Sequence, residues 1–163
     1  MTQSKITMIA IFIFIILVIV GVFYFWRIVF SKMPNPPLTT DQIRVGSAVF
    51  TVELATTTLA EARGLSFRAS LAEGTGMLFT FSPGVQNFWM KDMNFPIDII
   101  WIASGKVAGF VQDAMPQPGV ALWNLTVYTS PDGVDRVLEV NAGTVAKDSI
   151  AIGNSVVFSQ ETD

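Results

Sequence analysis

The chain contains neither cysteine nor histidine among its 163 residues. Without thiols or imidazoles it has no disulfide, no zinc site of the usual kind, and no Cys–His or Ser–His–Asp catalytic arrangement. Charge is also sparse, because only 14% of the residues are charged while 51% are apolar. The sequence therefore predicts no cofactor and no metal site, and it assigns no catalytic residue.

The longest apolar run, residues 6–26, contains no charged residue. As a helix it would be about 31 Å long, which matches the roughly 30 Å hydrocarbon core of a bilayer. The run ends in four aromatic residues, 23–26, and no Ala-x-Ala cleavage pattern follows it. We therefore predict an uncleaved single-pass signal anchor in a cell membrane, and neither a cleaved signal peptide nor a buried core helix.

Three prolines lie within residues 31–40 and predict a semi-extended spacer. No internal repeat or low-complexity tract is visible in the remaining chain. The predicted division is a head at 1–5, a transmembrane anchor at 6–30, a Pro-rich spacer at 31–42 and a folded domain at 43–163.

The side of the membrane is predicted from charge and architecture. Lys5 precedes the apolar run, whereas Arg27 and Lys32 follow it, so the positive-inside count leans slightly toward a cytoplasmic domain. A short head, one anchor and one globular domain is, however, typical of exported tethered domains, and we favour the extracytoplasmic side. Beyond Lys32 the net charge is −6, which argues against a nucleic-acid partner and a polybasic lipid contact.

Short strands dominate the expected secondary structure of the domain. The clearest pair is a hairpin of 97–102 and 106–111, joined by a tight turn at Ser104-Gly105. A short helix is expected at 57–63, with Thr57 as its cap. Further strands are expected at 47–54, 77–81, 88–93, 125–129, 134–140 and 154–158. This pattern predicts a mainly β domain, a compact β-sandwich or small barrel with one or two short helices.

Asp98 lies in a strand that is apolar on both faces, Ile97-Asp98-Ile99-Ile100-Trp101-Ile102. A buried carboxylate must be paired, hydrogen-bonded or neutral, and the expected partners are Arg63, Arg68 and Lys91. The residue is either part of a ligand site or part of an internal ion pair that fixes the fold.

Glu139 is the second carboxylate in an apolar strand, and it shares a strand face with Val137 and Asn141. One interpretation is a solvated strand face. In the other, Glu139 and Asp98 lie about 5–9 Å apart and act as the acid and base of a hydrolase. These two residues are the catalytic candidates, although the sequence assigns a role to neither.

Two further groups combine apolar and cationic side chains. Trp89, Met90 and Lys91, together with Met77, either line an apolar pocket with a cation at its rim or belong to the core. Arg63 and Arg68 either hold an anionic group or tie the short helix to a carboxylate.

The order of short motifs resembles one family, the domain of unknown function 192 (DUF 192). The motifs are Arg63-Gly64-Leu65-Ser66-Phe67-Arg68, Gly76-Met77-Leu78-Phe79-Thr80-Phe81, Phe88-Trp89-Met90-Lys91 with Pro96-Ile97-Asp98-Ile99, Leu138-Glu139-Val140 with Ala142-Gly143, and Ile152-Gly153-Asn154. The resemblance spans about 43–158 and implies a compact, mostly β prokaryotic domain, often exported or membrane-tethered, without an established activity. Asn154 and Asp92 depart from the family, in which an acidic residue and an asparagine are commoner.

The resemblance implies a shared polar site. Its positions in this chain, which are the ligand-binding candidates, are Arg63, Arg68, Met77, Trp89, Met90, Lys91, Asp98 and Glu139. We predict first a non-catalytic, membrane-tethered domain that binds a small ligand. The alternatives are an envelope assembly module that meets a partner protein, and a carboxylate-dependent hydrolase.

Overall fold

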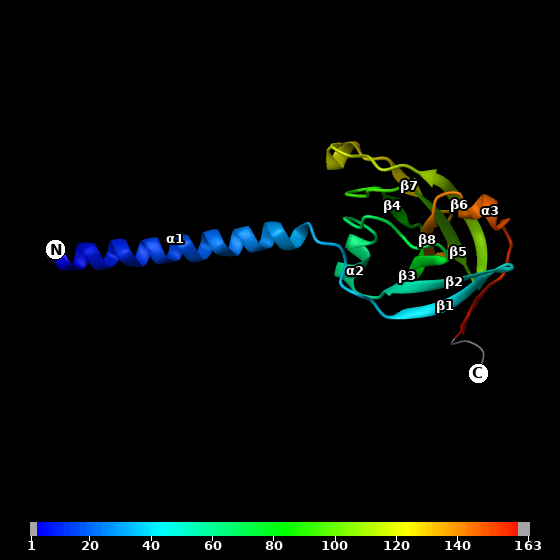
Figure 1. Cartoon of the computed structure of the whole chain (residues 1–163), viewed down its shortest axis with the longest axis horizontal. Coiled ribbons are helices and arrows are strands. Elements are labelled where there is room, and N and C mark those ends of the chain that lie inside the picture. The colour runs from blue at the N-terminus through cyan, green and yellow to red at the C-terminus, as the bar shows by residue number, and fades with distance from the viewer. Residues whose placement is uncertain (1–2, 160–163) are drawn as a thin grey trace. The chain divides into compact units, whose positions relative to one another are not determined.

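Figure 1 shows the computed structural model of the chain, which describes residues 3–159. The described chain divides into two compact units after Met33. The first unit is the helix α1 (Gln3–Ser31), whose segment Thr7–Phe30 is long and apolar enough to cross a membrane by length and composition. The same properties fit a signal sequence, so this helix supports a membrane association but does not distinguish an anchor from a signal sequence.

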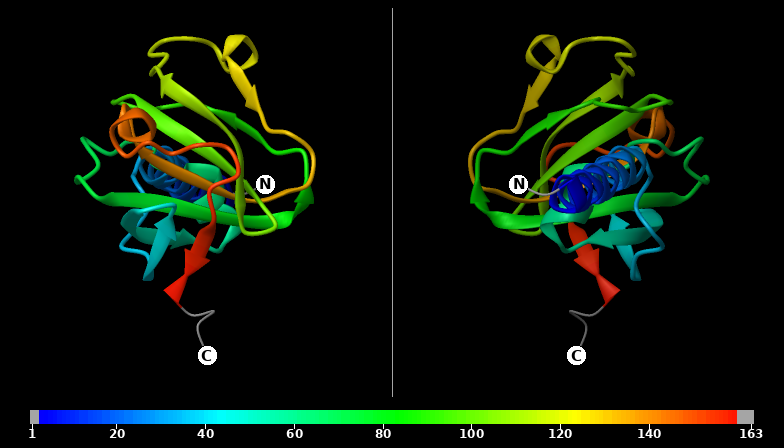
Figure 2. Two further views of the ribbon diagram at one scale, coloured as in Figure 1. Left: turned by 90° about the vertical axis from the view of Figure 1, so that its right-hand side faces the viewer. Right: turned by 90° about the vertical axis from the view of Figure 1, so that its left-hand side faces the viewer.

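The second unit is built on a curled seven-stranded sheet, and this confirms the mainly β prediction (Figures 1 and 2). The strand order is β6-β5-β8-β3-β2-β1-β9, with β2 and β3 parallel and the other neighbours antiparallel. The strands are β1 (Thr40–Val45), β2 (Ala48–Ala55), β3 (Thr75–Gly84), β5 (Ile97–Ala103), β6 (Lys106–Ala114), β8 (Val134–Asn141) and β9 (Val156–Phe158). A separate two-stranded ribbon pairs β4 (Asn87–Trp89) with β7 (Val127–Thr129).

Both faces of the sheet are buried, which explains the nearly continuous apolar sequence of the central strands. In β8, Leu138 and Val140 join one apolar cluster, while Val137 joins the other. Residues of α3 (Thr144–Lys147) and the chain after it pack on the first face. The second face is covered by α2 (Thr58–Arg63) and by the β4–β7 ribbon.

The curled sheet nearly closes on itself at one end. Lys106 at the start of β6 forms an isolated bridge with Ser155, just before β9. The backbone N–H of Val156 also donates to the carbonyl of Gly105 at 2.8 Å. The two outer strands are therefore joined through the β5–β6 turn, which satisfies backbone groups that an open sheet edge would expose.

Several local predictions are confirmed and two need correction. The hairpin turn lies at Ser104-Gly105, where both residues have positive φ as a tight turn requires. Thr57 caps α2 by accepting a hydrogen bond from Ala60 N–H at 3.1 Å. The strand predicted at 88–93 ends at Trp89, because Met90 and Met93 turn into the core instead of continuing a ladder. A strand at 40–45 was not predicted, although it occupies an inner position of the sheet.

The chain just after α1 is fixed to the domain. Asn35 is buried, and its side-chain amide donates to the carbonyls of Ala60 and Gly64, both at 3.0 Å. These carbonyls lie at the end of α2, where the Ala60 carbonyl also accepts from the Gly64 N–H at 2.8 Å, so Asn35 supplies a second donor there. Leu38 packs against the second apolar cluster. Part of the segment predicted as a spacer, 31–42, thus contributes to the compact unit that begins at Pro34.

Candidate functional site

Glu139 lies in the middle of β8, between Met77 of β3 and Ile99 of β5 on the adjacent strands. Its residue exposure is only 6%, so the expectation of a solvated strand face is not met. Within residues 3–159, its Oε2 atom is buried and has no hydrogen-bond partner. An unpartnered buried oxygen of this kind is destabilising on its own and often marks a functional site.

The surroundings of Glu139 favour its neutral form. Burial raises the pKa of Glu139 from an ordinary 4.5 to about 8, and the positive charge of Arg68 acts in the opposite direction. At neutral pH the side chain is therefore mainly a carboxylic acid, which can both donate and accept a hydrogen bond.

Glu139 lines a pocket of about 310 Å³ on the second face of the sheet. One wall is α2 with the residues after it, and the other is aromatic. The rings of Phe79 and Phe88 meet edge to face at 5.1 Å between centroids, and Phe81 stacks on Phe79 at 6.3 Å. Apolar rings, the buried Glu139 and further polar side chains such as Glu61 and Arg63 thus line one pocket, which is the usual make-up of a small-molecule site.

Gly64 lies where the end of α2 meets Glu139. It ends α2 with φ +50° and ψ −131°, a conformation that residues with a side chain rarely adopt. A Cβ atom there would lie 3.7 Å from Oε2 of Glu139 and 3.5 Å from the ring of Phe79. These distances are ordinary contacts, so the positive φ, and not lack of space, requires glycine at the end of α2.

Arg68 is held beside this site by a carboxylate that sequence reasoning missed. Its guanidinium binds both oxygens of Glu53 at 2.5 and 2.7 Å. Glu53 on β2 and Glu139 on β8 flank Met77 on the intervening strand, so all three lie in one row across the sheet. The available signal was a second glutamate within an apolar strand, Val52-Glu53-Leu54.

Asp98 lies on the opposite face of the sheet from Glu139. Register pairs Glu139 with Ile99, and neighbouring residues of a strand point to opposite faces. The Asp98 carboxylate accepts hydrogen bonds from the backbone N–H groups of Asp113 at 2.9 Å and Val145 at 2.8 Å. Asp98 thus joins β6 and α3 to β5, and the sheet separates it from the other candidate carboxyl.

The remaining predicted site residues are divided among three places. Arg63 and Trp89 line the same pocket as Glu139, and Trp89 is 47% exposed. Met90 is buried in the core. Lys91 lies in a different hollow and pairs with the adjacent Asp92.

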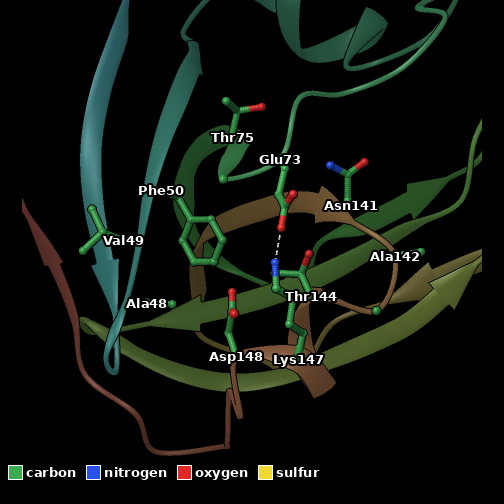
Figure 3. Close-up of a pocket in the computed structure, with 12 residues that line it drawn as sticks. Ala48, Val49, Phe50, Glu73, Thr75, Asn141, Ala142, Thr144, Lys147 and Asp148 are labelled. Carbon is green, nitrogen blue, oxygen red and sulfur yellow. Dashed lines mark hydrogen bonds and ion pairs between the residues drawn. The ribbon is translucent and has the colours of Figure 1, made fainter.

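A second and larger hollow, of about 740 Å³, lies beside α3 (Figure 3). An ion pair between Glu73 and Lys147 crosses it, and both side chains are largely exposed. Their hydrogen bond lowers the pKa of Glu73 and raises that of Lys147. Glu73 and Lys147 pair with each other in solvent, whereas the Glu139 pocket holds a buried oxygen that has no partner among the described residues, so the Glu139 pocket is the stronger candidate.

The residues described do not gather ligands for a metal ion. No group of three or more acidic side chains is close enough in residues 3–159 to hold one. The arrangement around Glu139 is instead suited to a ligand that hydrogen-bonds to the carboxyl group and packs against the aromatic rings.

Fold and site together define a small, mainly β domain that follows an apolar helix. Its curled sheet is covered on both faces, and one face carries a pocket with a buried carboxyl group. Residues 41–158 match the family DUF192, described as "Uncharacterized ACR", and the chain belongs to that family. This confirms the resemblance drawn from the motifs.

Two solved structures resemble the chain. One, from Sinorhizobium meliloti 1021, is a protein that its description proposes to be a transcription regulator; it has 29% identity and a TM-score of 0.68, and the match covers 77% of this chain and 98% of that one. The other is a protein of unknown function from Novosphingobium aromaticivorans DSM 12444, with 29% identity, a TM-score of 0.67, and coverage of 77% and 91%. No curated protein is significantly similar to the chain.

Proposed function

We propose that the domain is a non-catalytic binding module that takes a small neutral ligand into the Glu139 pocket. The observation that carries this proposal is the buried Oε2 atom, which has no partner among the described residues and adjoins an aromatic-walled pocket. A ligand that supplied the missing hydrogen bond would remove a desolvation penalty of about 1–3 kcal/mol.

The state of Glu139 favours a neutral ligand. Because its pKa is about 8, the group is mainly protonated at pH 7 and pairs best with a hydroxyl or amide that both donates and accepts. The rings of Phe81 and Phe88 offer flat apolar surfaces beside it. Hydroxyl groups on a ring with an apolar face, as in a sugar, fit this combination.

Catalysis by the carboxylate pair Asp98 and Glu139 is not supported, since the sheet lies between them. A role in transcription, suggested only by the description of one similar structure, has no support in the charge of this chain. The chain beyond Lys32 carries a net charge of −6, whereas binding to nucleic acid needs a basic surface.

The second part of the proposal is that α1 tethers the domain to a membrane, with the domain on the extracytoplasmic side. The length and composition of Thr7–Phe30 support the tether. Because the chain has no cysteine, a single cysteine at the exposed Ser82 would report the side. An extracytoplasmic domain predicts that intact cells are labelled there by a membrane-impermeant maleimide, and labelling only after lysis would refute it.

The pocket is tested with residues 34–163, which form a compact unit without α1. The match to one similar solved structure covers 98% of that chain, so that protein consists almost entirely of this fold. The melting temperature of residues 34–163 is measured against neutral monosaccharides, N-acetylated amino sugars and polyols. A compound that binds only the folded state raises the melting temperature. We expect Glu139→Ala to abolish that rise, and Glu73→Gln, in the other hollow, to leave it unchanged.

Two outcomes would contradict the proposal. The first is that no neutral compound shifts the melting temperature. The second is a shift that survives Glu139→Ala, which would place the ligand elsewhere. A shift lost in Glu73→Gln but kept in Glu139→Ala would move the site to the hollow beside α3.

A further inference from the structure

The segment that leads from the end of β6 to the first residue of β7 exposes large apolar side chains to solvent. We call residues 115–127 the apolar arm; it contains the short 3-10 helix η1 (Leu122–Asn124). Trp123 is 85% exposed, far more than the other tryptophans of the domain. The other exposed apolar residues of the arm are Met115, Val120, Leu122 and Val127. Figure 2 shows the arm, in yellow, standing out from the body of the domain.

The arm also lacks charge. No Asp, Glu, Lys or Arg occurs from residue 114 to residue 131, although the chain beyond Lys32 is otherwise rich in acidic residues. A solvated loop normally carries polar and charged residues, and a contiguous exposed apolar patch marks an interaction surface.

The exposure of these side chains belongs to an ordered structure. Gln117 bridges the two sides of the arm, because its Oε1 accepts from Thr126 N–H at 2.9 Å and its Nε2 donates to Thr126 Oγ1 at 3.1 Å. Gly119, with φ +74°, makes the turn between them. The arm therefore holds Leu122 and Trp123 outward instead of allowing them to collapse onto the core.

The partner is indicated by the chain that precedes the domain. Only residues 31–34 separate Phe30, the end of the candidate membrane span, from Asn35, which is fixed to α2. At no more than about 3.6 Å per residue, this connection keeps the domain at the surface of any bilayer that the helix crosses. Within the domain, the arm lies toward the same end as α2, away from α3 and β9 (Figure 1).

We propose that the apolar arm inserts Trp123 and Leu122 into the interface of the membrane that α1 spans. Tryptophan is enriched at the level of lipid headgroups, where its ring is buried while its N–H stays hydrated. Because the arm is uncharged, the contact depends on apolar insertion and not on anionic lipid. The proposal rests on the tether proposed above and is independent of the ligand in the Glu139 pocket.

The test uses the full chain, in which a cysteine placed by Asn124→Cys is unique. Asn124 is exposed and adjoins Trp123, so the substitution preserves the tryptophan. The matched control is Ile152→Cys, at an exposed site in the turn before β9. Each variant is labelled with the fluorophore NBD and reconstituted into phosphatidylcholine vesicles, with or without headgroup-proximal spin-labelled lipid. Flotation of the vesicles measures the tether separately.

Insertion predicts severalfold stronger quenching by spin-labelled lipid at position 124 than at 152, and a blue-shifted emission at 124. Adding Trp123→Ser to the Asn124→Cys variant should reduce the quenching, while raised salt should not. Equal, weak quenching at both positions in floated protein would overturn the insertion and leave the tether intact, and would point to a protein as the partner. Failure of the chain to float would refute the tether and the insertion together.

Discussion

Replacing Glu139 by glutamine should change how the stability of the domain depends on pH. In the folded domain burial raises the pKa of Glu139 to about 8, whereas the unfolded chain leaves it near 4.5. Between these values the folded state holds a proton that the unfolded state has lost. The free energy of unfolding contributed by this group is therefore fully present below pH 4.5 and decreases as the pH rises toward 8.

The size of the effect follows from the shift in pKa. Each unit of difference corresponds to 1.36 kcal/mol, so the contribution falls by about 3 kcal/mol between pH 4.5 and 7. That loss is large beside the 5–15 kcal/mol typical of a whole domain. Glutamine has nearly the same shape and does not titrate, so Glu139→Gln should remove this part of the pH dependence.

The assay is urea denaturation of residues 34–163, followed by far-UV circular dichroism at several pH values from 4.5 to 8. The measured quantity is the difference in unfolding free energy between the wild type and Glu139→Gln at each pH, because other titrating groups cancel in it. Glu61→Gln is the matched control, since Glu61 also lines the pocket but is half-exposed. We expect the Glu139→Gln difference to move in favour of glutamine by about 3 kcal/mol from pH 4.5 to 7. A difference that stays constant across this range would refute the assignment of a buried, neutral Glu139.

Three further stability predictions concern residues that fix the fold, and each is measured by denaturation at pH 7. Asp98→Asn should cost about 2–3 kcal/mol, because the two backbone N–H groups bond to different oxygens of the carboxylate and an amide has only one oxygen. Asp92→Asn, at an exposed position, should change stability little. Equal effects of the two substitutions would contradict a stabilising role of the buried Asp98 carboxylate. Gly76→Ala should cost about 3 kcal/mol or more, since its methyl group would lie 2.7 Å from a backbone oxygen of β8, while Gly84→Ala meets no atom within 4 Å and should be tolerated. Asn35→Ala should cost about 1–3 kcal/mol, because the Gly64 carbonyl loses the amide donor and the Ala60 carbonyl keeps only its bond from the Gly64 N–H; an unchanged midpoint would show that the segment after α1 does not stabilise the domain.

The elements that sequence reasoning placed correctly are those with local causes. The turn at Ser104-Gly105 and the cap at Thr57 depend on backbone and side-chain preferences within a few residues. The strand at 40–45 was missed because its position depends on pairing with β2 and β9, which lie elsewhere in the chain. Likewise, nothing local indicated that Asn35 would be buried against the end of α2.

In the candidate site, too, local features were predictable from the sequence and features that depend on distant parts of the chain were not. Glu139 was recognisable as a carboxylate in an apolar strand, but its sequence neighbours did not distinguish a solvated face from a buried one. Burial comes from α2 and the β4–β7 ribbon, which cover that face of the sheet. Glu53 was missed because its importance depends on holding Arg68 beside Met77.

By itself, the sequence determined the apolar helix, the mainly β domain, and which residues of each strand share a face, because these follow from composition and from the two-residue period of a strand. It also determined the family, through the order of its short motifs. Only the tertiary structure decided that Asp98 and Glu139 lie on opposite faces. Alternation fixes the faces within one strand, whereas the relation between two strands depends on register, and a slip of one residue between β5 and β8 would have placed both carboxyls on the same side.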